Sequence, residues 1–181
     1  MLMKAKKLFP MAQVYQLLEP GPVVMVSTAQ DHKANIMTMS WHMMIDFEPP
    51  IFACIMSSDN YSFKALYETK ECVFNIPTAE LAGTIVGVGN CSGATVDKFK
   101  KFKLTPQPAS QVNVPMINEC FAHLECKVVD RSRAEKYNMF ILEVIKAWHT
   151  PSKKRQRTLH HCGDGVFVID GKIIKLKSNK K

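Results

Sequence analysis

The segment from Asn35 to His42 carries the residues best suited to binding a polar aromatic ligand. On a β-strand, the period of two would place Thr38, Ser40 and His42 on one face and Met37, Met39 and Trp41 on the other. The first face could donate hydrogen bonds to carbonyl or ring-nitrogen acceptors of a flat ring, and thioether and indole groups could contact the ring itself. The alternative is an ordinary barrel strand whose Ser and Thr side chains face solvent, which is the commoner case on spacing alone.

A second candidate is the loop at residues 57–62, Ser-Ser-Asp-Asn-Tyr-Ser, which leads into a predicted helix. The free N–H groups and the dipole at a helix N-terminus favour an anion such as a phosphate. The alternative is that Asn60 or Ser62 only caps the helix, and such caps greatly outnumber phosphate sites. The loop therefore indicates a phosphate site only together with other motifs.

The sequence shows no pattern typical of nucleophilic or metal chemistry. His160, His161 and Cys162 are adjacent, and neighbours on an extended chain point in opposite directions, so they cannot easily chelate one metal. No serine lies in a G-x-S-x-G turn. The six cysteines are scattered without a C-x-x-C pair, which indicates reduced, mostly buried thiols. We predict neither a catalytic side chain nor a metal site.

Short elements with polar joints must position the two candidate segments. Strands are predicted at 23–28, 36–42, 51–56, 72–76, 120–128 and 139–148, and helices at 11–18, 63–67, 79–88 and 97–102. Apolar and polar residues alternate over 120–128, so we expect one mainly apolar face there. A last hairpin is predicted from 166–169 and 172–176, because Asp170-Gly171 is a type I′ turn signal. Strands outnumber helices and the joints are short, so we predict a mainly β, antiparallel, closed or partly closed barrel with peripheral helices.

The composition fits one globular domain. The 181 residues, with a mass of 20.5 kDa, predict a single domain over 1–181, with the barrel at about 11–176 and flexible basic ends at 1–10 and 177–181. Hydrophobic residues make up 46% and charged residues 22%, which argues against disorder. No apolar run approaches the roughly 20 residues that span a bilayer, and no signal-peptide pattern is present. We expect a cytoplasmic protein that does not enter membranes.

The net charge of +8 is carried by the periphery of the sequence. Twelve of the 24 basic residues lie near the two ends and in the run at 153–157, and the remaining 12 are outnumbered by 16 acidic residues. A nucleic-acid groove would instead interleave basic and aromatic residues across the fold. We do not expect nucleic-acid binding, although a basic nucleic-acid-binding barrel stays open as the least favoured function.

Several motifs, taken in order, resemble the flavin reductase-like family, including the flavoredoxins. They are Pro22-Val-Val-Met-Val-Ser-Thr28, Asn35-x-Met-Thr-x-Ser-Trp41, Pro49-Pro50, the loop at 57–62, Phe74-Asn-Ile-Pro77, Ser92-Gly93 with Asp97-Lys-Phe99, Leu104-Thr-Pro106, and Pro115-x-Ile-x-Glu119-x-x-Ala122-x-Leu-Glu-Cys126. The resemblance runs from about Pro22 to Val144 and keeps the family's motif order, which makes it specific although no single motif is.

The resemblance implies an FMN-binding split β-barrel of antiparallel Greek-key type that works as a homodimer, with the flavin in a cleft at the subunit interface. It implies that the flavin ring is lined by Met37, Thr38, Met39, Ser40 and Trp41. It implies that the ribityl phosphate is held by Ser57, Ser58, Asn60, Tyr61 and Ser62. The cleft would be completed by Asn75, Ser92, Asp97, Lys98 and Phe99.

One departure from the family bears on the electron donor. Many NAD(P)H-dependent members carry Gly-Asp-His before the strand that ends in Glu-Val, and this chain has Glu135-Lys136-Tyr137 there. We therefore expect NAD(P)H to be a poor reductant and an acidic redox protein, such as a ferredoxin or a flavodoxin, to be the partner. The predicted function is an FMN-dependent oxidoreductase or electron carrier that reduces a small-molecule acceptor. The alternative is a flavin-binding module without turnover.

Overall fold

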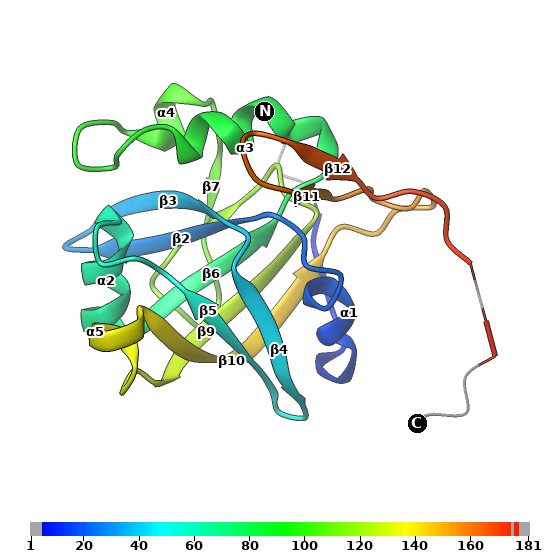
Figure 1. The fold of residues 1–181 in the computed structure, drawn as a ribbon, viewed down its shortest axis with the longest axis horizontal. Helices are drawn as coiled ribbons and strands as arrows, with labels where there is room; N and C mark the ends of the chain where they lie inside the picture. The colour runs from blue at the N-terminus through cyan, green and yellow to red at the C-terminus, as the bar shows by residue number, and fades with distance from the viewer. Residues whose placement is uncertain (1–4, 175, 178–181) are drawn as a thin grey trace.

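The computed structural model describes residues 5–174, 176 and 177, which form a curled antiparallel sheet surrounded by short helices (Figure 1). The strands are β1 (Lys7–Leu8), β2 (Val24–Gln30), β3 (Lys33–Met39), β4 (His42–Phe47), β5 (Pro50–Ile55), β6 (Glu71–Ile76), β7 (Pro106–Gln107), β8 (Met116–Ile117), β9 (Ala122–Asp130), β10 (Met139–His149), β11 (Leu159–His161) and β12 (Phe167–Ile169). The helices are α1 (Tyr15–Leu18), α2 (Tyr61–Thr69), α3 (Ala82–Gly89), α4 (Lys98–Lys101) and α5 (Ala134–Tyr137), with the 3-10 turns η1 (Met11–Gln13) and η2 (Ala79–Leu81).

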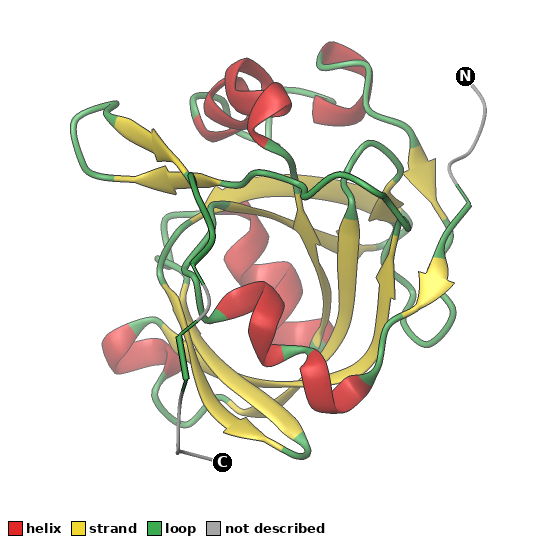
Figure 2. Ribbon diagram, turned by 90° about the vertical axis from the view of Figure 1, so that its right-hand side faces the viewer, coloured by secondary structure: helices red, strands yellow, loops and turns green. Residues whose placement is uncertain are grey.

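The main sheet has the strand order β3-β2-β6-β9-β10-β5-β4, and β1 pairs with β10 outside this path. Every pairing in it is antiparallel. The two edge strands, β3 and β4, follow each other in the chain and are joined only by Ser40 and Trp41. The sheet must therefore curl until its edges meet at this corner, which gives the barrel in Figure 2. The predicted mainly β, antiparallel barrel with peripheral helices is confirmed.

The barrel interior holds the largest hydrophobic core. Alternate residues of β2 and β3, such as Val24 and Met37, point into it, and Phe52 packs edge to face on Phe74 with ring centroids 4.8 Å apart. Leu18 of α1 belongs to the same core. The period of two seen in the sequence thus reports which residues of each strand face the barrel interior.

A second core joins the outer face of the β2–β3 hairpin to α3 and α4. Met25 and Ile36 pack there with Ile85 and Val88 of α3 and with Phe99 of α4. Figure 1 shows these helices above the hairpin, with α3 next to β11 and β12. This packing fixes the end of α3 and the start of α4 against β3.

The strand predicted at 120–128 is observed as β9, and over residues 122–126 both of its faces are buried. His123 and Glu125, on the face that carries the polar residues, have no exposed surface. The Glu125 carboxylate accepts hydrogen bonds from the Ser110 N–H and from Trp148 Nε1. The segment that precedes β8 covers this face, and its polar groups satisfy the buried carboxylate.

The predicted C-terminal hairpin is wrong in its pairing. β12 pairs with β11, and the turn between them contains Asp164 and Gly165, whose φ angles are 47° and 74°. Positive φ at both central positions is the type I′ geometry, so the turn uses an earlier Asp-Gly pair than the predicted Asp170-Gly171. Residues 171–174 form no strand, and Lys175 lies outside the described residues.

Part of the predicted flexible end at residues 1–10 is instead ordered. β1 pairs with β10, and Lys6 Nζ donates to the carbonyl oxygen of Cys120 at 2.7 Å. Residues 1–4 and 178–181 of the two predicted ends lie outside the described residues. Among the helices that the structure describes, none has the length and apolar character needed to cross a membrane.

Candidate functional site

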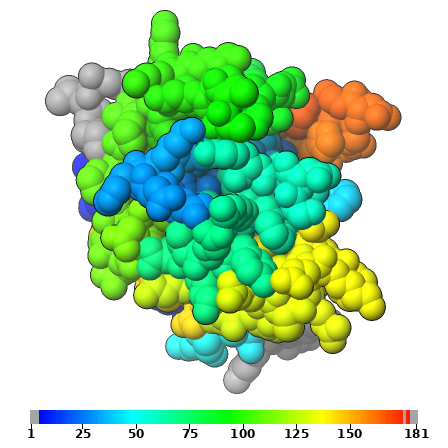
Figure 3. Space-filling model, turned by 90° about the vertical axis from the view of Figure 1, so that its left-hand side faces the viewer, coloured from blue at the N-terminus to red at the C-terminus, as the bar shows by residue number. Residues whose placement is uncertain are grey.

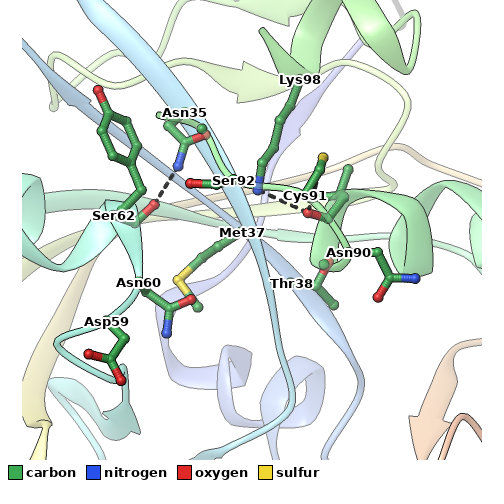
Figure 4. Close-up of a pocket in the computed structure, with 14 residues that line it drawn as sticks. Asn35, Met37, Thr38, Asp59, Asn60, Ser62, Asn90, Cys91, Ser92 and Lys98 are labelled. Carbon is green, nitrogen blue, oxygen red and sulfur yellow. Dashed lines mark hydrogen bonds between the residues drawn. The ribbon is translucent and has the colours of Figure 1, made fainter. Parts of the chain in front are cut away.

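A cleft of about 330 Å³ opens between β3, the N-terminus of α2 and the segment that links α3 to α4 (Figure 4). This volume is at the lower end of the range of small-molecule sites, roughly 300–1,000 Å³. Its lining residues are Asn35, Met37, Thr38, Asp59, Asn60, Tyr61, Ser62, Val88, Gly89, Asn90, Cys91, Ser92, Gly93 and Lys98. Most of these side chains are polar, so the cleft is built to form hydrogen bonds as well as to enclose a ligand.

The N-terminus of α2 forms one wall of the cleft. Asn60 is its N-cap residue, with extended backbone (φ −74°, ψ 131°) and no side-chain capping bond. The N–H groups of Tyr61 and Ser62 stand at the positions that an α-helix leaves without intrahelical partners, whereas the Phe63 N–H donates to the Asn60 carbonyl at 2.9 Å. The helix dipole adds partial positive charge at this end. The wall therefore offers a binding place for an anion.

A buried polar network holds β3 against α2 at the floor of the cleft. Asn35 Nδ2 donates to Ser62 Oγ at 2.8 Å, and the hydroxyls of Thr28 and Ser62 form a hydrogen bond at 3.1 Å. All three side chains are buried. Ser62 is thus more than a simple cap, because its hydroxyl links the helix to two strands.

Gly93 lies directly on this network. A Cβ at this position would stand 2.1 Å from Asn35 Oδ1 and 2.4 Å from Asn35 Cγ, far inside contact distance. The turn that carries Ser92 can approach β3 this closely only because residue 93 has no side chain.

Lys98 is the one cation in the cleft lining that the structure describes. Only 5% of its surface is exposed, and its ammonium donates to the Val88 carbonyl at the end of α3 at 2.9 Å. Burial lowers the pKa of Lys98, and the nearby Cys91 thiol partly opposes this effect. A cation held in this way favours the binding of a negatively charged ligand, and it stabilises negative charge that develops on a bound ligand during a reaction.

Two further hollows continue the cleft at its ends. One, of about 550 Å³, shares Asn35, Asp59, Asn60 and Tyr61 with it, and the other, of about 410 Å³, shares Thr38, Gly89 and Asn90. Figure 3 shows this face, with the green α4 region above the blue β2–β3 hairpin and with α2 beside the hairpin. The cavities together form a groove along β3 that can take an elongated ligand.

The structure brings many of the predicted site residues to this groove. The cleft itself is lined by Met37, Thr38, Asn60, Tyr61, Ser62, Ser92 and Lys98. Met39 and Ser40 line the 410 Å³ hollow, and Ser58 lines the 550 Å³ hollow. Their contact with a flavin stays a prediction.

Five predicted residues lie outside these cavities. Trp41, at the corner between β3 and β4, is one of them, and the other four have structural roles of their own. Asn75 is fully buried, with its amide donating to Ser27 Oγ at 2.8 Å. Asp97 caps α4 by accepting the Lys100 N–H, and Phe99 belongs to the second core. Ser57 Oγ accepts the N–H of Asp59 within the loop.

The expected alternation along 35–42 ends at the corner between β3 and β4. Trp41 is 70% exposed, whereas Met37 and Met39 on the same predicted face belong to the barrel core. The Thr38 hydroxyl donates to the Ile85 carbonyl at 2.7 Å instead of facing solvent. His42 starts a new strand, and its Nε2 lies 2.8 Å from the Pro22 carbonyl oxygen. The chain changes direction at residues 40 and 41, so the period of two does not carry across them.

Sequence reasoning missed several residues of the cleft. Asn35 stands in a motif quoted above but was not predicted as a site residue, and Asn90 and Cys91 follow α3 with no motif of their own. Their roles depend on contacts between distant segments.

Glu135 lies outside the cleft lining, and its carboxylate accepts a hydrogen bond from the Tyr67 hydroxyl at 2.8 Å. In the part of the chain that the structure describes, no group of three or more His, Cys, Asp or Glu side chains could hold a metal ion.

Known proteins resemble this chain in sequence and in fold. An uncharacterized protein of Archaeoglobus fulgidus is 32% identical over 117 residues, which is 65% of this chain and 66% of that protein. The uncharacterized protein YddH of Escherichia coli is 28% identical over 174 residues, with 88% of this chain and 92% of YddH covered.

Among solved structures, an FMN-binding domain of a flavin reductases-like enzyme from Shewanella baltica superposes with a TM-score of 0.89 at 23% identity, covering 98% of this chain and 100% of that chain. The flavoredoxin of Desulfovibrio vulgaris gives a TM-score of 0.79 at 21% identity, covering 88% and 91%. These likenesses confirm the split-barrel fold expected from the motifs. The family model of the flavin reductase like domain matches residues 17–169. The chain therefore belongs to the flavin reductase-like family.

Proposed function

We propose that the cleft binds FMN and that the protein is an FMN-dependent oxidoreductase or electron carrier. The observation that carries this proposal is the cleft itself, in which the N-terminus of α2 and the buried Lys98 lie at one groove with the polar and thioether side chains of β3. The Shewanella baltica structure with the same fold is described as FMN-binding, which supports the choice of cofactor.

The residues of the groove fit the parts of FMN. The N–H groups at the start of α2, with Asn60, Tyr61 and Ser62, would hold the phosphate. Met37 and Thr38, with the adjoining hollow at Met39 and Ser40, would line the ring. Bound FMN would supply hydride and electron transfer. The chain's own residues would bind it and exclude water, and Lys98 would favour negative charge in the cleft.

Spectroscopy of the purified protein tests the cofactor. A flavin absorbance spectrum, and tighter binding of FMN than of riboflavin by the apoprotein, would support the proposal. Each charge-assisted hydrogen bond to the phosphate should contribute about 1.5–3 kcal/mol. Equal affinity for FMN and riboflavin would contradict the phosphate assignment. Absence of flavin binding would contradict the proposed cofactor and favour the alternative function, a nucleic-acid-binding barrel.

Anaerobic reduction distinguishes an electron-transfer protein from a flavin-binding module without turnover. The family's Gly-Asp-His is replaced by Glu135-Lys136-Tyr137, so we expect NAD(P)H to reduce the protein poorly. An acidic ferredoxin or flavodoxin is the proposed donor, and a small molecule the proposed acceptor. The basic run at 153–157 would attract such a partner, although Arg155 is paired with Asp170.

We also propose a homodimer. The edge strand β4 carries Met43, Ile45 and Phe47, each more than half exposed, next to the exposed Trp41 that precedes it. A bulge between Met44 and Asp46 interrupts the alternation of faces, but all four large apolar side chains reach the surface and form a patch that is costly to leave in water. A second copy of the chain is the occupant we propose, with each copy burying the same patch.

A further inference from the structure

We propose that Asn138 is a positioning residue for the anion-binding end of the cleft. It lies outside the cleft lining and acts through the loop at residues 57–60, which connects β5 to α2. The inference rests on the proposed function, because it concerns how the loop is held for the phosphate of FMN.

Asn138 contacts both ends of the turn that leads out of β5. Its side-chain Oδ1 accepts the N–H of Ser58 at 3.1 Å, and its backbone carbonyl accepts the N–H of Met56 at 2.9 Å. Within the loop, the Asn60 N–H donates to the Ser57 carbonyl at 2.9 Å. The loop thus has two internal bonds donated by backbone N–H groups, from Asn60 N–H to the Ser57 carbonyl and from Asp59 N–H to Ser57 Oγ. Asn138, 80 positions away from Ser58, binds Ser58 in the loop and Met56 just before it.

The position of Asn138 is itself well fixed. It ends α5 in the left-handed conformation (φ 57°, ψ 20°), and its N–H donates to the Ala134 carbonyl at 2.8 Å. The next residue, Met139, starts β10 and pairs with Ile55 of β5. Asparagine is among the few residues other than glycine that adopt this backbone readily, and it also provides the acceptor that glycine lacks.

The segment that ends at Asn138 also holds the far end of α2. Glu135 accepts the Tyr67 hydroxyl, and the Arg131 guanidinium lies 4.2 Å from the centroid of the Tyr67 ring. The yellow α5 lies below α2 on the face seen in Figure 3. The segment at residues 131–138 therefore contacts both α2 and the loop before it.

The test compares Asn138→Gly with wild-type protein in the affinity of the apoprotein for FMN and for riboflavin. Glycine keeps the left-handed backbone and deletes only the acceptor for Ser58. We expect FMN to bind about fivefold to tenfold more weakly, with riboflavin changed less than twofold, because only FMN uses the phosphate end. Asn138→Asp, which retains an oxygen acceptor, should bind FMN within about threefold of wild type at 0.5 M salt, where the added charge is screened.

One further measurement needs no flavin, and one control variant distinguishes the loop from α2 as a whole. Exchange of the Ser58 amide hydrogen in the apoprotein should be faster in Asn138→Gly and unchanged in Asn138→Asp. Tyr67→Phe removes the bond to Glu135 at the other end of α2 and should leave the ratio of FMN to riboflavin affinity unchanged.

An unchanged ratio in Asn138→Gly, or an equal loss for both flavins, would overturn the positioning role. If wild-type protein itself binds FMN no better than riboflavin, the proposed phosphate site fails instead.

Discussion

Replacing Gly93 by alanine tests the geometry at the floor of the cleft. The new Cβ would lie 2.1 Å from Asn35 Oδ1, so the buried Asn35 amide must move by more than 1 Å to reach ordinary contact distance. That movement breaks its 2.8 Å hydrogen bond to Ser62. A buried polar group left without its partner costs about 1–3 kcal/mol, and the strain of overpacking costs roughly as much again.

We therefore expect Gly93→Ala to lower the free energy of unfolding by roughly 2–4 kcal/mol. For a chain of this size that corresponds to a fall in the unfolding temperature of roughly 4–16 °C. Calorimetry and urea unfolding measure both quantities. Gly83→Ala is the matched control, because a Cβ at Gly83 in α3 meets nothing within 4 Å. It should stabilise the protein by up to about 1 kcal/mol, since alanine is the better helix former.

A double-mutant cycle identifies the clashing partner. Asn35→Ala deletes all three atoms that the new Cβ would meet, which are Oδ1, Cγ and Nδ2 of Asn35. In that background, Gly93→Ala should cost close to nothing, which gives a coupling energy of more than about 1 kcal/mol. If the full penalty persists in the Asn35→Ala protein, the close approach of Gly93 to Asn35 is not its cause and the reasoning is refuted.

Three further predictions concern assembly, electron transfer and pH. Met43→Lys, at an exposed site on β4, should reduce the mass of the flavin-loaded protein in light scattering from twice 20.5 kDa to 20.5 kDa. The control Val129→Lys, at an exposed site on β9, should leave the mass unchanged. A monomeric wild-type protein would contradict the dimer. Reduction by an acidic carrier should be fast at low salt and slow at high salt, whereas reduction by NADH or NADPH should be slow at both. Rapid turnover with NADPH at any salt concentration would contradict the proposed donor. Burial lowers the pKa of His42 below its ordinary value of 6.5, so the unfolded chain takes up a proton at a higher pH than the folded one. The free energy of unfolding should therefore decrease as the pH falls below 6.5. His42→Gln should flatten this part of the curve of unfolding free energy against pH, and an unchanged curve would show that His42 is not responsible.

Local periodicity was sufficient to predict most of the strands and the helix that becomes α2. The β-branched run over 23–28 indicated a strand, and the structure buries all of it. The alternation over 36–39 and the spacing of Phe63, Leu66 and Tyr67 indicated a strand and a helix, which are observed as parts of β3 and α2. The hydroxyl-rich loop before α2 was likewise recognisable, because helix entrances have a local signature. The order of the motifs then indicated the family, which the family model confirms.

The strand predicted across 36–42 shows where local reasoning stops. Its period of two holds to Met39 and fails at Trp41, because the two edges of the curled sheet meet at that corner. The buried Glu125 is a second case, since its polar type indicates exposure until a distant segment covers it with N–H donors.

By itself, the sequence determined the class of fold, the order of the elements and the two segments that contribute most to the cleft. Only the tertiary structure decided which polar residues face the cleft and which support it from outside. Asn35 meets Gly93, and Asn138 meets Ser58, across long stretches of chain. Such contacts leave no periodic trace in the sequence, because they are set by how the sheet closes and how the helices pack on it.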